Sequence, residues 1–360
     1  MTAIGERKAD HLAICAEEDV GFRRASTLLE CVRLVHDALP DLELEDVDTS
    51  VTLFGKRLRV PIVIAAMTGG TDEAGRINAE LASIAEAKGL AFGLGSQRAM
   101  VVHPTKASTY DVRQVAPTCL VFGNVGLVQA RAMSAADLRR MIEQIGADAL
   151  CVHMNPAMEL VQPGGDRDFT AGLDTLRRLV AELGVPIIAK ETGCGLSPDV
   201  GRRLRSIGVE HVDVSGAGGT SWVGVETRRA TAAGDVAARA LGEALWDWGI
   251  PTAASVALLR PLGFHTVVAT GGIASGLDVA RSLALGATVA GIARPVLRAL
   301  RSGGRAGAIA FLEGIEAELR AVMLLTASPD LSALRAAPRV LTGELVAWLT
   351  QLSEPDPRRR

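Results

Sequence analysis

Eight short apolar runs along this chain each end abruptly in a small or polar residue. The runs are Val60–Ala66, Leu90–Leu94, Cys119–Phe122, Ala149–Val152, Pro186–Ala189, His211–Val214, Thr266–Ala269 and Thr288–Gly291. Helix-like stretches separate most of them. A strand buried on both faces reads as a continuous apolar run, and eight such strands alternating with helices predict a closed (β/α)8 TIM barrel. The carboxyl ends of the strands would then form the rim that carries the chemistry.

The predicted organisation is a single α/β domain in three parts. An N-terminal extension at residues 1–59 precedes the barrel at 60–330, and a C-terminal helix and tail follow at 331–360. In the extension, Ala25–Leu39 is helix-like, and Leu42–Val60 alternates in the manner of a hairpin that plugs the barrel floor.

Two long segments open from the predicted rim. Asn155–Thr170 follows the fourth strand and is rich in Pro, Gly and Asp. Gly216–Gly249 follows the sixth strand, opens Gly-rich and continues as a helix-like stretch. Loops of this length are uncommon unless they are functional, so both are expected to cover a ligand.

Composition excludes several classes of partner. No apolar stretch approaches the ~18 residues that span a bilayer, and the charged start Met1–Asp10 is unlike an export signal. The net charge of -3 argues against non-specific nucleic-acid binding. The five cysteines include no C-x-x-C pair, which is typical of free thiols in a reducing compartment. We therefore expect a cytoplasmic protein with neither a membrane nor a nucleic-acid partner.

Glycine-rich turns follow the last three strands. Gly271-Gly272 and Gly291–Arg294 lie after strands seven and eight, where barrels often bind a phosphate through backbone N–H groups. Asp213–Ser221 at the end of strand six offers hydroxyls and amides that suit an anion or a ribityl chain. A simple turn and a flexible hinge are the structural alternatives for these loops.

Lys190 ends the fifth strand with Glu191 beside it. A lysine at this place in a barrel has two functional interpretations. It forms a Schiff base with a carbonyl substrate, or it places a positive charge beside an electron-rich ring. A salt bridge to Glu191 or to another neighbour is the structural alternative.

The fourth loop concentrates polar groups, beginning with His153 and Asn155. Glu159 is a candidate ligand for a hard divalent cation such as Mg²⁺, which takes one or two carboxylates together with phosphates and water. Asp166 and Asp168 are better explained by turn chemistry and capping.

Basic residues form two further groups. Arg7 and Lys8, with His11 nearby, open the chain, and Ser96-Gln97-Arg98 follows the second strand. Clusters of this kind clamp phosphates.

In this order the motifs resemble the type 2 isopentenyl-diphosphate isomerases, which are flavin-dependent (β/α)8 barrels. The resemblance covers nearly the whole chain through Arg7–Leu12, Ala66–Gly70, Gly95–Arg98, Gly123-Asn124, His153–Asp168, Lys190-Glu191, Ser221-Trp222, Thr270–Ile273 and Gly291–Pro295. No single motif is decisive, but the ordered set is highly specific.

The resemblance implies a role for each matching position. FMN would contact Ala66, Met67, Thr68, Ser96, Asn124, Lys190, Ser215, Thr220, Gly271, Gly272, Ile273, Ile292 and Ala293. The substrate, a prenyl diphosphate, would contact Arg7, Lys8, His11, Ser96, Gln97, Arg98, His153 and Asn155. Glu159 would hold Mg²⁺, and Lys190 and His153 would take part in catalysis. Reduced FMN with NADPH as reductant, and a homotetramer or homo-octamer, are implied in the same way.

One position departs from the family pattern. Met158 stands where the family has a Gln directly before the metal-binding Glu, and a thioether has no proton to donate. The chain is then an isomerase that manages without this amide or works at a reduced rate, or an altered paralogue that acts on or binds another prenyl diphosphate. A separate alternative, independent of Met158, is an FMN-dependent oxidoreductase of the 2-hydroxy-acid type. The last would use His153 as base and Arg98 for a carboxylate.

Overall fold

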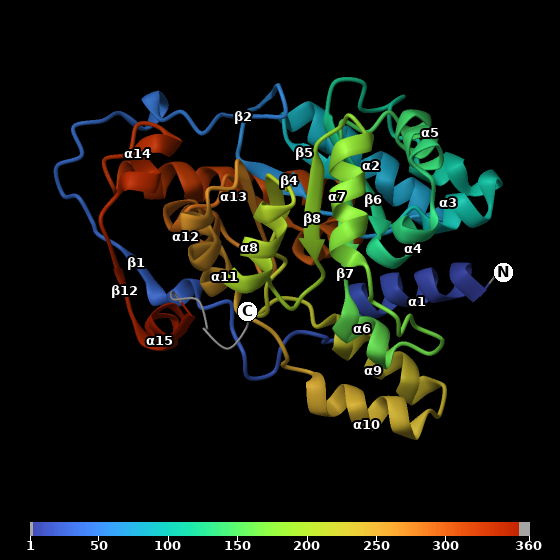
Figure 1. The fold of residues 1–360 in the computed structure, drawn as a ribbon. Helices are drawn as coiled ribbons and strands as arrows, with labels where there is room; N and C mark the ends of the chain where they lie inside the picture. The colour runs from blue at the N-terminus through green and yellow to red at the C-terminus, as the bar shows by residue number, and fades with distance from the viewer. Residues whose placement is uncertain (1–2, 353–360) are drawn as a thin grey trace.

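A closed barrel of eight parallel strands forms the centre of the molecule (Figure 1). The computed structural model describes residues 3–352. In order around the barrel, the strands are β4 (Ile62–Ile64), β5 (Ala91–Gly93), β6 (Leu120–Gly126), β7 (Ala149–Met154), β8 (Ile187–Glu191), β9 (His211–Asp213), β10 (Thr266–Thr270) and β11 (Val289–Ile292), and β11 pairs with β4. Each overlaps one of the eight apolar runs, so the predicted (β/α)8 barrel is confirmed.

Helices connect the strands and surround the barrel (Figure 1). They are α2 (Asp72–Lys88), α3 (Arg98–Val102), α4 (Leu127–Ala132), α5 (Ala135–Ile145), α6 (Pro156–Val161), α7 (Gly172–Glu182), α8 (Pro198–Ser206), α9 (Trp222–Ala232), α10 (Val236–Leu245), α11 (Thr252–Leu259), α12 (Gly276–Leu285) and α13 (Arg294–Leu324), the last interrupted by non-helical backbone at Gly304. Gly89 and Gly286 end α2 and α12 in the left-handed region that glycine favours.

A hairpin closes the amino end of the barrel. Its strands β2 (Val51–Leu53) and β3 (Lys56–Leu58) pair antiparallel within the segment expected to form a floor hairpin. Leu53 and Leu58 join the apolar cluster inside the barrel. The ring of Phe54, at the tip of the hairpin, contacts the ring of Phe122 edge-on, with the centroids 5.9 Å apart. The carboxyl end is therefore the open one.

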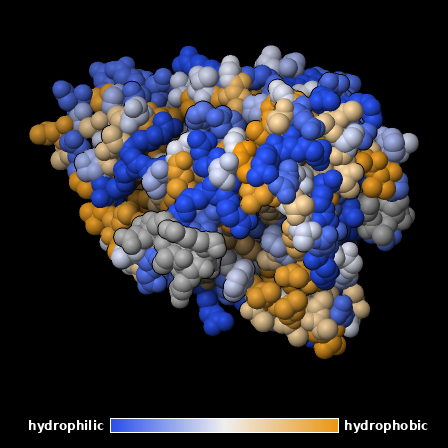
Figure 2. Space-filling model, in the orientation of Figure 1, coloured by the Kyte–Doolittle hydropathy of each residue, from blue (hydrophilic) through white to orange (hydrophobic). Residues whose placement is uncertain are grey.

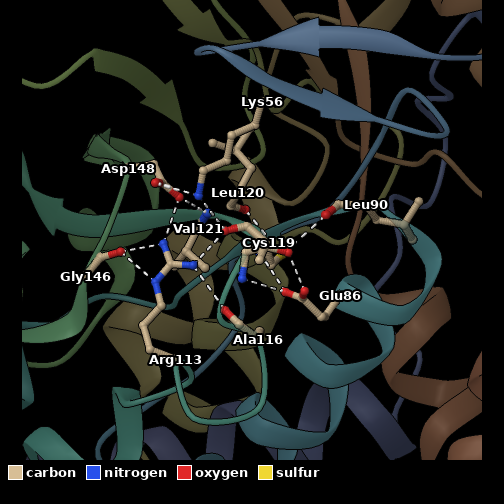
Figure 3. A network of polar contacts seen from close by, with 11 residues as sticks. Lys56, Glu86, Leu90, Arg113, Ala116, Cys119, Leu120, Val121, Gly146 and Asp148 are labelled. Carbon is tan, nitrogen blue, oxygen red and sulfur yellow. Dashed lines mark hydrogen bonds and ion pairs between the residues drawn. The ribbon is translucent and has the colours of Figure 1, made fainter.

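Arg113 ties the strands together at this floor (Figure 3). Its guanidinium donates to the carbonyls of Gly146 and Cys119, at 2.8 and 2.7 Å, and to Asp148 Oδ2 at 2.8 Å. Lys56 from the hairpin bonds the other oxygen of Asp148 at 2.8 Å. Although burial opposes it, these cations and the Val121 N–H hold the pKa of Asp148 below its usual value.

Replacing Arg113 by methionine should lower the free energy of unfolding by about 3 kcal/mol, because Asp148 and the carbonyls lose a charged donor. Urea denaturation measures the change. Arg139→Met is the matched control, since exposed Arg139 donates to one carbonyl, that of Glu182, and should cost about 0.5 kcal/mol or less. Equal losses in both variants would contradict the assignment.

The helix predicted over Ala25–Leu39 is wrong. That segment holds a short 3₁₀ turn, η1 (Leu29–Cys31), and the strand β1 (Val32–Leu34). β1 pairs antiparallel with β12 (Arg339–Leu341), close to the other end of the chain. Pairing across three hundred residues overrides local helical preference, because the strand pattern is completed only by a distant partner.

The C-terminal segment contains α14 (Leu331–Ala336), β12 and α15 (Gly343–Leu352). The tail that was expected after it begins at residue 353, which lies outside the described residues.

Several helices cover the open, carboxyl end of the barrel. The N-terminal helix α1 (Ala3–Glu17) lies beside α6 and α9, and α10 projects below them in Figure 1. The exposed apolar residues Val236, Leu241 and Trp248 lie on α10 and the turn after it. Figure 2 shows an orange area at the lower right, where α10 lies in Figure 1. Within residues 3–352, no helix is both long and apolar enough to cross a bilayer.

Candidate active site

A cavity of about 520 Å³ lies at the carboxyl end of the barrel. It brings together twenty of the residues predicted from the sequence: Arg7, Lys8, His11, Ala66, Met67, Thr68, Ser96, Arg98, Asn124, His153, Asn155, Met158, Glu159, Lys190, Ser215, Thr220, Gly271, Gly272, Ile273 and Ala293.

Two predicted residues do not line this cavity. Gln97 is fully buried; its Oε1 accepts from the N–H of Asn124 at 2.7 Å, and its Nε2 faces the sulfur of Met100. Its side chain therefore fixes the strand end that carries Asn124. Ile292 is fully buried in the main apolar core, so its side chain faces away from the cavity.

The carboxyl end of helix α1 is held in place by two arginines from α13. Arg294, the first residue of α13, donates to the carbonyls of Cys15 and Glu18 at 3.1 and 2.7 Å. Arg298 donates to the carbonyls of Ala16 and Glu18. Cationic donors at the last carbonyls of a helix complement its dipole, so they hold the basic residues of α1 at the cavity mouth.

Three cations face the cavity without carboxylate partners. The guanidinium groups of Arg7 and Arg98 form no hydrogen bond or ion pair with any described residue. Burial and the nearby Arg98 lower the pKa of the Arg7 guanidinium. Lys8 is 9% exposed, and burial together with Arg7 lowers its pKa to about 7. Such uncompensated charge favours an anionic ligand.

His11 anchors the middle of α1 to α9. Its Nε2 lies 2.6 Å from Glu226 Oε1, and Arg229 bonds the other carboxylate oxygen at 2.8 Å. Burial opposes ionisation of Glu226, but the bonds from His11 and Arg229 hold its pKa below the usual value. Trp222 packs edge-on against the His11 ring at 5.3 Å between centroids.

Glu159 points its carboxylate into a ring of donors. Oε1 accepts from Asn155 Nδ2 at 2.9 Å, and Oε2 accepts from Gln162 Nε2 at 3.1 Å and from the backbone N–H of Asp166 at 2.8 Å. A carboxylate oxygen has two lone pairs. Oε1 therefore keeps one for a cation, and the carboxylate is held rigidly at the cavity wall.

His153 is held as a neutral imidazole. Its Nδ1 lies 2.7 Å from Asn124 Oδ1, and an amide oxygen only accepts, so the ring donates there and keeps a lone pair on Nε2. Burial and the charges of Lys190, Lys8 and Arg98 lower the pKa of His153 to about 4. A ring with so low a proton affinity is a poor general base near neutral pH.

Lys190 pairs with Asp213 rather than with Glu191. Their strands are adjacent, and Lys190 and Asp213 are register partners whose Nζ and Oδ2 atoms lie 2.7 Å apart. Both side chains are 8% exposed. An ammonium held by a buried carboxylate is a poor nucleophile. The geometry thus favours the interpretation of Lys190 as a fixed positive charge over a Schiff base.

Glu191 has a separate, structural role. Successive side chains of a strand point to opposite faces, and the carboxylate of Glu191 accepts from the backbone N–H groups of Thr192 and Cys194. Burial raises its pKa to about 8. It therefore shapes the loop after β8 and does not line the cavity.

The glycine-rich loops after β9 and β10 approach each other backbone to backbone at the cavity. A Cβ on Gly271 would lie 2.2 Å from the carbonyl oxygen of Gly216, and one on Gly219 would lie 2.3 Å from the nitrogen of Gly272. Gly271 has a φ of 107°, which side chains disfavour. The loops after β9 and β10 thus pack backbone against backbone, and their glycines line the cavity, which lets a ligand approach the main chain closely.

Hydroxyl groups without a hydrogen-bond partner, in residues that line the cavity, show whether the site suits a polar heterocyclic ring. The Oγ1 atoms of Thr68, Thr192 and Thr270 are buried, have no hydrogen-bond partner, and belong to residues that line the cavity. Buried polar groups are normally satisfied. A heterocycle with amide and carbonyl groups would satisfy them, so the site fits FMN.

The comparisons with known proteins agree with this geometry. The family model described as FMN-dependent dehydrogenase matches residues 2–163 and 154–340. A solved structure of mandelate oxidase with 3,3-difluoro-2-hydroxy-3-phenylpropionic acid shares the fold, with a TM-score of 0.65 and 18% identity over 93% of this chain and 95% of that chain. The fold and the family match define a (β/α)8 flavoprotein of the FMN-dependent class.

Curated relatives define the group within that class. The chain is 42% identical to the isopentenyl-diphosphate delta-isomerase of Methanosarcina barkeri, over 98% of this chain and 96% of the relative. It is 44% identical to that of Nostoc sp., over 91% and 93%. The chain belongs to the type 2 isopentenyl-diphosphate delta-isomerase family.

Three residues that position the site were not assigned a role from the sequence. Asp213 lies within the sixth apolar run, and a carboxylate beside Lys190 in a parallel register was the signal that could have paired it with that lysine. Glu226 and Tyr110 gave no such signal, because each reaches α1 from a segment whose position only the folded chain reveals.

Proposed function

We propose that this chain converts isopentenyl diphosphate to dimethylallyl diphosphate with bound FMN, in its reduced form, and Mg²⁺. The observation that carries the proposal is that one cavity is lined by both cationic and apolar side chains. Arg7, Lys8 and Arg98 supply positive charge, while Met67, Met158 and Trp222 supply apolar surface in the same space. A short hydrocarbon with a diphosphate head group is a ligand that fits this combination of charges and apolar surface.

Reduced FMN supplies an electron-rich ring that stabilises positive charge on a neighbouring hydrocarbon and exchanges a proton with it. The residues proposed to hold it are Ala66, Met67, Thr68, Ser96, Asn124, Lys190, Ser215 and Thr220, with Gly271, Gly272, Ile273 and Ala293 at its phosphate. Ile292 is not part of this set, because its side chain faces the apolar core. Lys190 complements the negative charge of the reduced ring. The support for this is the ion pair that fixes its ammonium in the wall.

Glu159 is the proposed ligand of Mg²⁺. Among residues 3–352 no cluster of three His, Cys, Asp or Glu side chains could hold a metal alone. A magnesium ion here would take its other ligands from the diphosphate and water, which is its usual behaviour at phosphate sites. The cation, with Arg7, Lys8, His11 and Arg98, would fix the head group so that remote binding energy orients the alkene. Ser96, His153 and Asn155 complete the proposed substrate set, from which Gln97 is removed because its side chain is buried outside the cavity.

The 2-hydroxy-acid oxidoreductase is the weaker alternative. Such an enzyme needs a base for the hydroxyl proton, and the burial and neighbouring cations that lower the pKa of His153 to about 4 oppose that role. We further propose NADPH as the reductant, a cytoplasmic location and a homotetramer or homo-octamer, all on the strength of the family.

The decisive experiment measures product formation from isopentenyl diphosphate with FMN, a reductant and Mg²⁺. We expect the wild type to form dimethylallyl diphosphate, and Met158→Gln to raise turnover at least tenfold, because the amide supplies a proton donor beside the alkene. Met67→Gln is the matched control and should give no gain.

The other outcomes separate the alternatives. Product from Met158→Gln alone would identify the wild type as an altered paralogue. Flavin-loaded wild type and variant that are both silent would refute the proposal, and bleaching of FMN by a 2-hydroxy acid would favour the oxidoreductase.

A further inference from the structure

Tyr110, the chain's single tyrosine, makes a hydrogen-bonded triangle with two residues of the cavity wall. Lys8 Nζ donates to Tyr110 Oη and to the carbonyl of Ser96, both at 2.7 Å. Tyr110 Oη in turn donates to the same carbonyl at 2.8 Å. The hydroxyl thus uses one donor and one acceptor function, and the ammonium keeps one of its three N–H groups free.

The tyrosine ring cannot shift within its slot. Tyr110 ends the 3₁₀ segment η3 (Pro104–Tyr110) and is fully buried. A Cβ on Gly69 would lie 2.0 Å from its ring, so that glycine's missing side chain makes the space the ring fills. The Lys8 ammonium lies 5.3 Å from the ring centroid. The hydroxyl is therefore a fixed point against which the flexible lysine is held.

We infer that Tyr110 is a positioning residue for the diphosphate: its hydroxyl holds the Lys8 ammonium so that the remaining N–H faces the cavity. The inference rests on the function proposed above. Lysine's four-carbon side chain has much rotamer freedom to lose on binding. Holding it beforehand lowers the cost of ligand binding, and Tyr110 does so without contributing an opposing charge.

The charge of Lys8 supplies a readout that a purely structural tyrosine would not affect. Burial and Arg7 lower the pKa of Lys8 to about 7. Of the groups around it, Arg7 and Arg98 stay charged, the pKa of His153 is lowered to about 4, and burial raises the pKa of Tyr110 above its usual value. Lys8 alone among these titrates between pH 6 and 8.

Loss of an acceptor for the ammonium lowers the lysine pKa further. Diphosphate binds the protonated lysine, so the damage should grow as the pH rises through 7.

The experiment uses FMN-loaded protein and inorganic diphosphate with Mg²⁺ as the probe, measured by calorimetry at pH 6 and 8, together with steady-state turnover. For Tyr110→Phe, which keeps the ring in its slot, we expect the dissociation constant and KM to rise about tenfold at pH 8 and about threefold or less at pH 6, with kcat within about twofold. Thr175→Val is the matched control: this buried residue also loses a hydroxyl bond, to the carbonyl of Ala171, and it does not line the cavity.

A double-mutant cycle with Lys8→Met completes the test. If Tyr110 acts through Lys8, Tyr110→Phe should have almost no further effect on diphosphate binding in the Lys8→Met background. An unchanged dissociation constant in Tyr110→Phe, or an equal loss in both backgrounds, would overturn the inference. So would a wild type that binds no diphosphate. A wild type that binds diphosphate but forms no product would instead count against the proposed isomerase, and the binding data would still decide the role of Tyr110.

Discussion

Lys190→Met should reduce turnover by a thousandfold or more, the largest effect expected of any single substitution in the cavity. The change removes the positive charge assigned to the flavin site and strands the buried carboxylate of Asp213. Breaking a buried ion pair from one side costs about 3 to 5 kcal/mol, so the free energy of unfolding should fall as well. Turnover with reduced FMN, flavin content and urea denaturation are the three measurements.

A double variant separates the two causes. Lys190→Met with Asp213→Asn removes the stranded charge, so most of the stability should return while turnover stays low. If Lys190→Met retained both its flavin and wild-type turnover, Lys190 would have no place in the mechanism. If the double variant recovered activity together with stability, the lysine would matter only for folding.

Glu159→Gln should lower turnover about a thousandfold and abolish its dependence on Mg²⁺, because a metal on a phosphate is worth several kcal/mol. The amide is nearly the same shape, but it loses the charge that the cation needs. It also presents a donor to Asn155, Gln162 or the Asp166 N–H, which already donate to this site. The measurement is turnover across a Mg²⁺ titration.

Asp166→Asn is the matched control for Glu159. Asp166 lies on the same loop and makes the same change of charge, but its side chain accepts from Gln129 and does not line the cavity. Its turnover should stay within about threefold of wild type. Glu159→Gln that still responds to Mg²⁺ with wild-type rates would show that the metal binds elsewhere or is not needed.

The barrel was predictable because its signal is local. A strand buried on both faces must be apolar along its length, and each of the eight runs satisfies that condition without reference to any other. The rim residues followed from the same argument, since a strand's end fixes where its next side chain lies. His153 and Lys190 could be placed side by side on that ground, as their register in β7 and β8 shows.

Contacts between segments that are distant in the sequence limited what could be predicted. β1 was mistaken for helix because its partner β12 is three hundred residues away. Tyr110 was missed because only the fold brings it under Lys8. Gln97 was chosen by its place in a motif, yet its side chain is buried because its Oε1 accepts from the backbone N–H of Asn124. Hydrophobic periodicity along the sequence carries no information about these long-range contacts.

The fastening of α1 by Arg294 and Arg298 has a consequence for the order in which the molecule is made. The chain's first helix is clamped by side chains from the start of α13, directly after the last barrel strand. On the ribosome, the carboxyl end of α1 is therefore clamped only after residue 298 has emerged, later than the segment of α9 that supplies the partner of His11. Until then its cationic side chains have no cavity to face. Ligand capture thus becomes possible only once the barrel has closed.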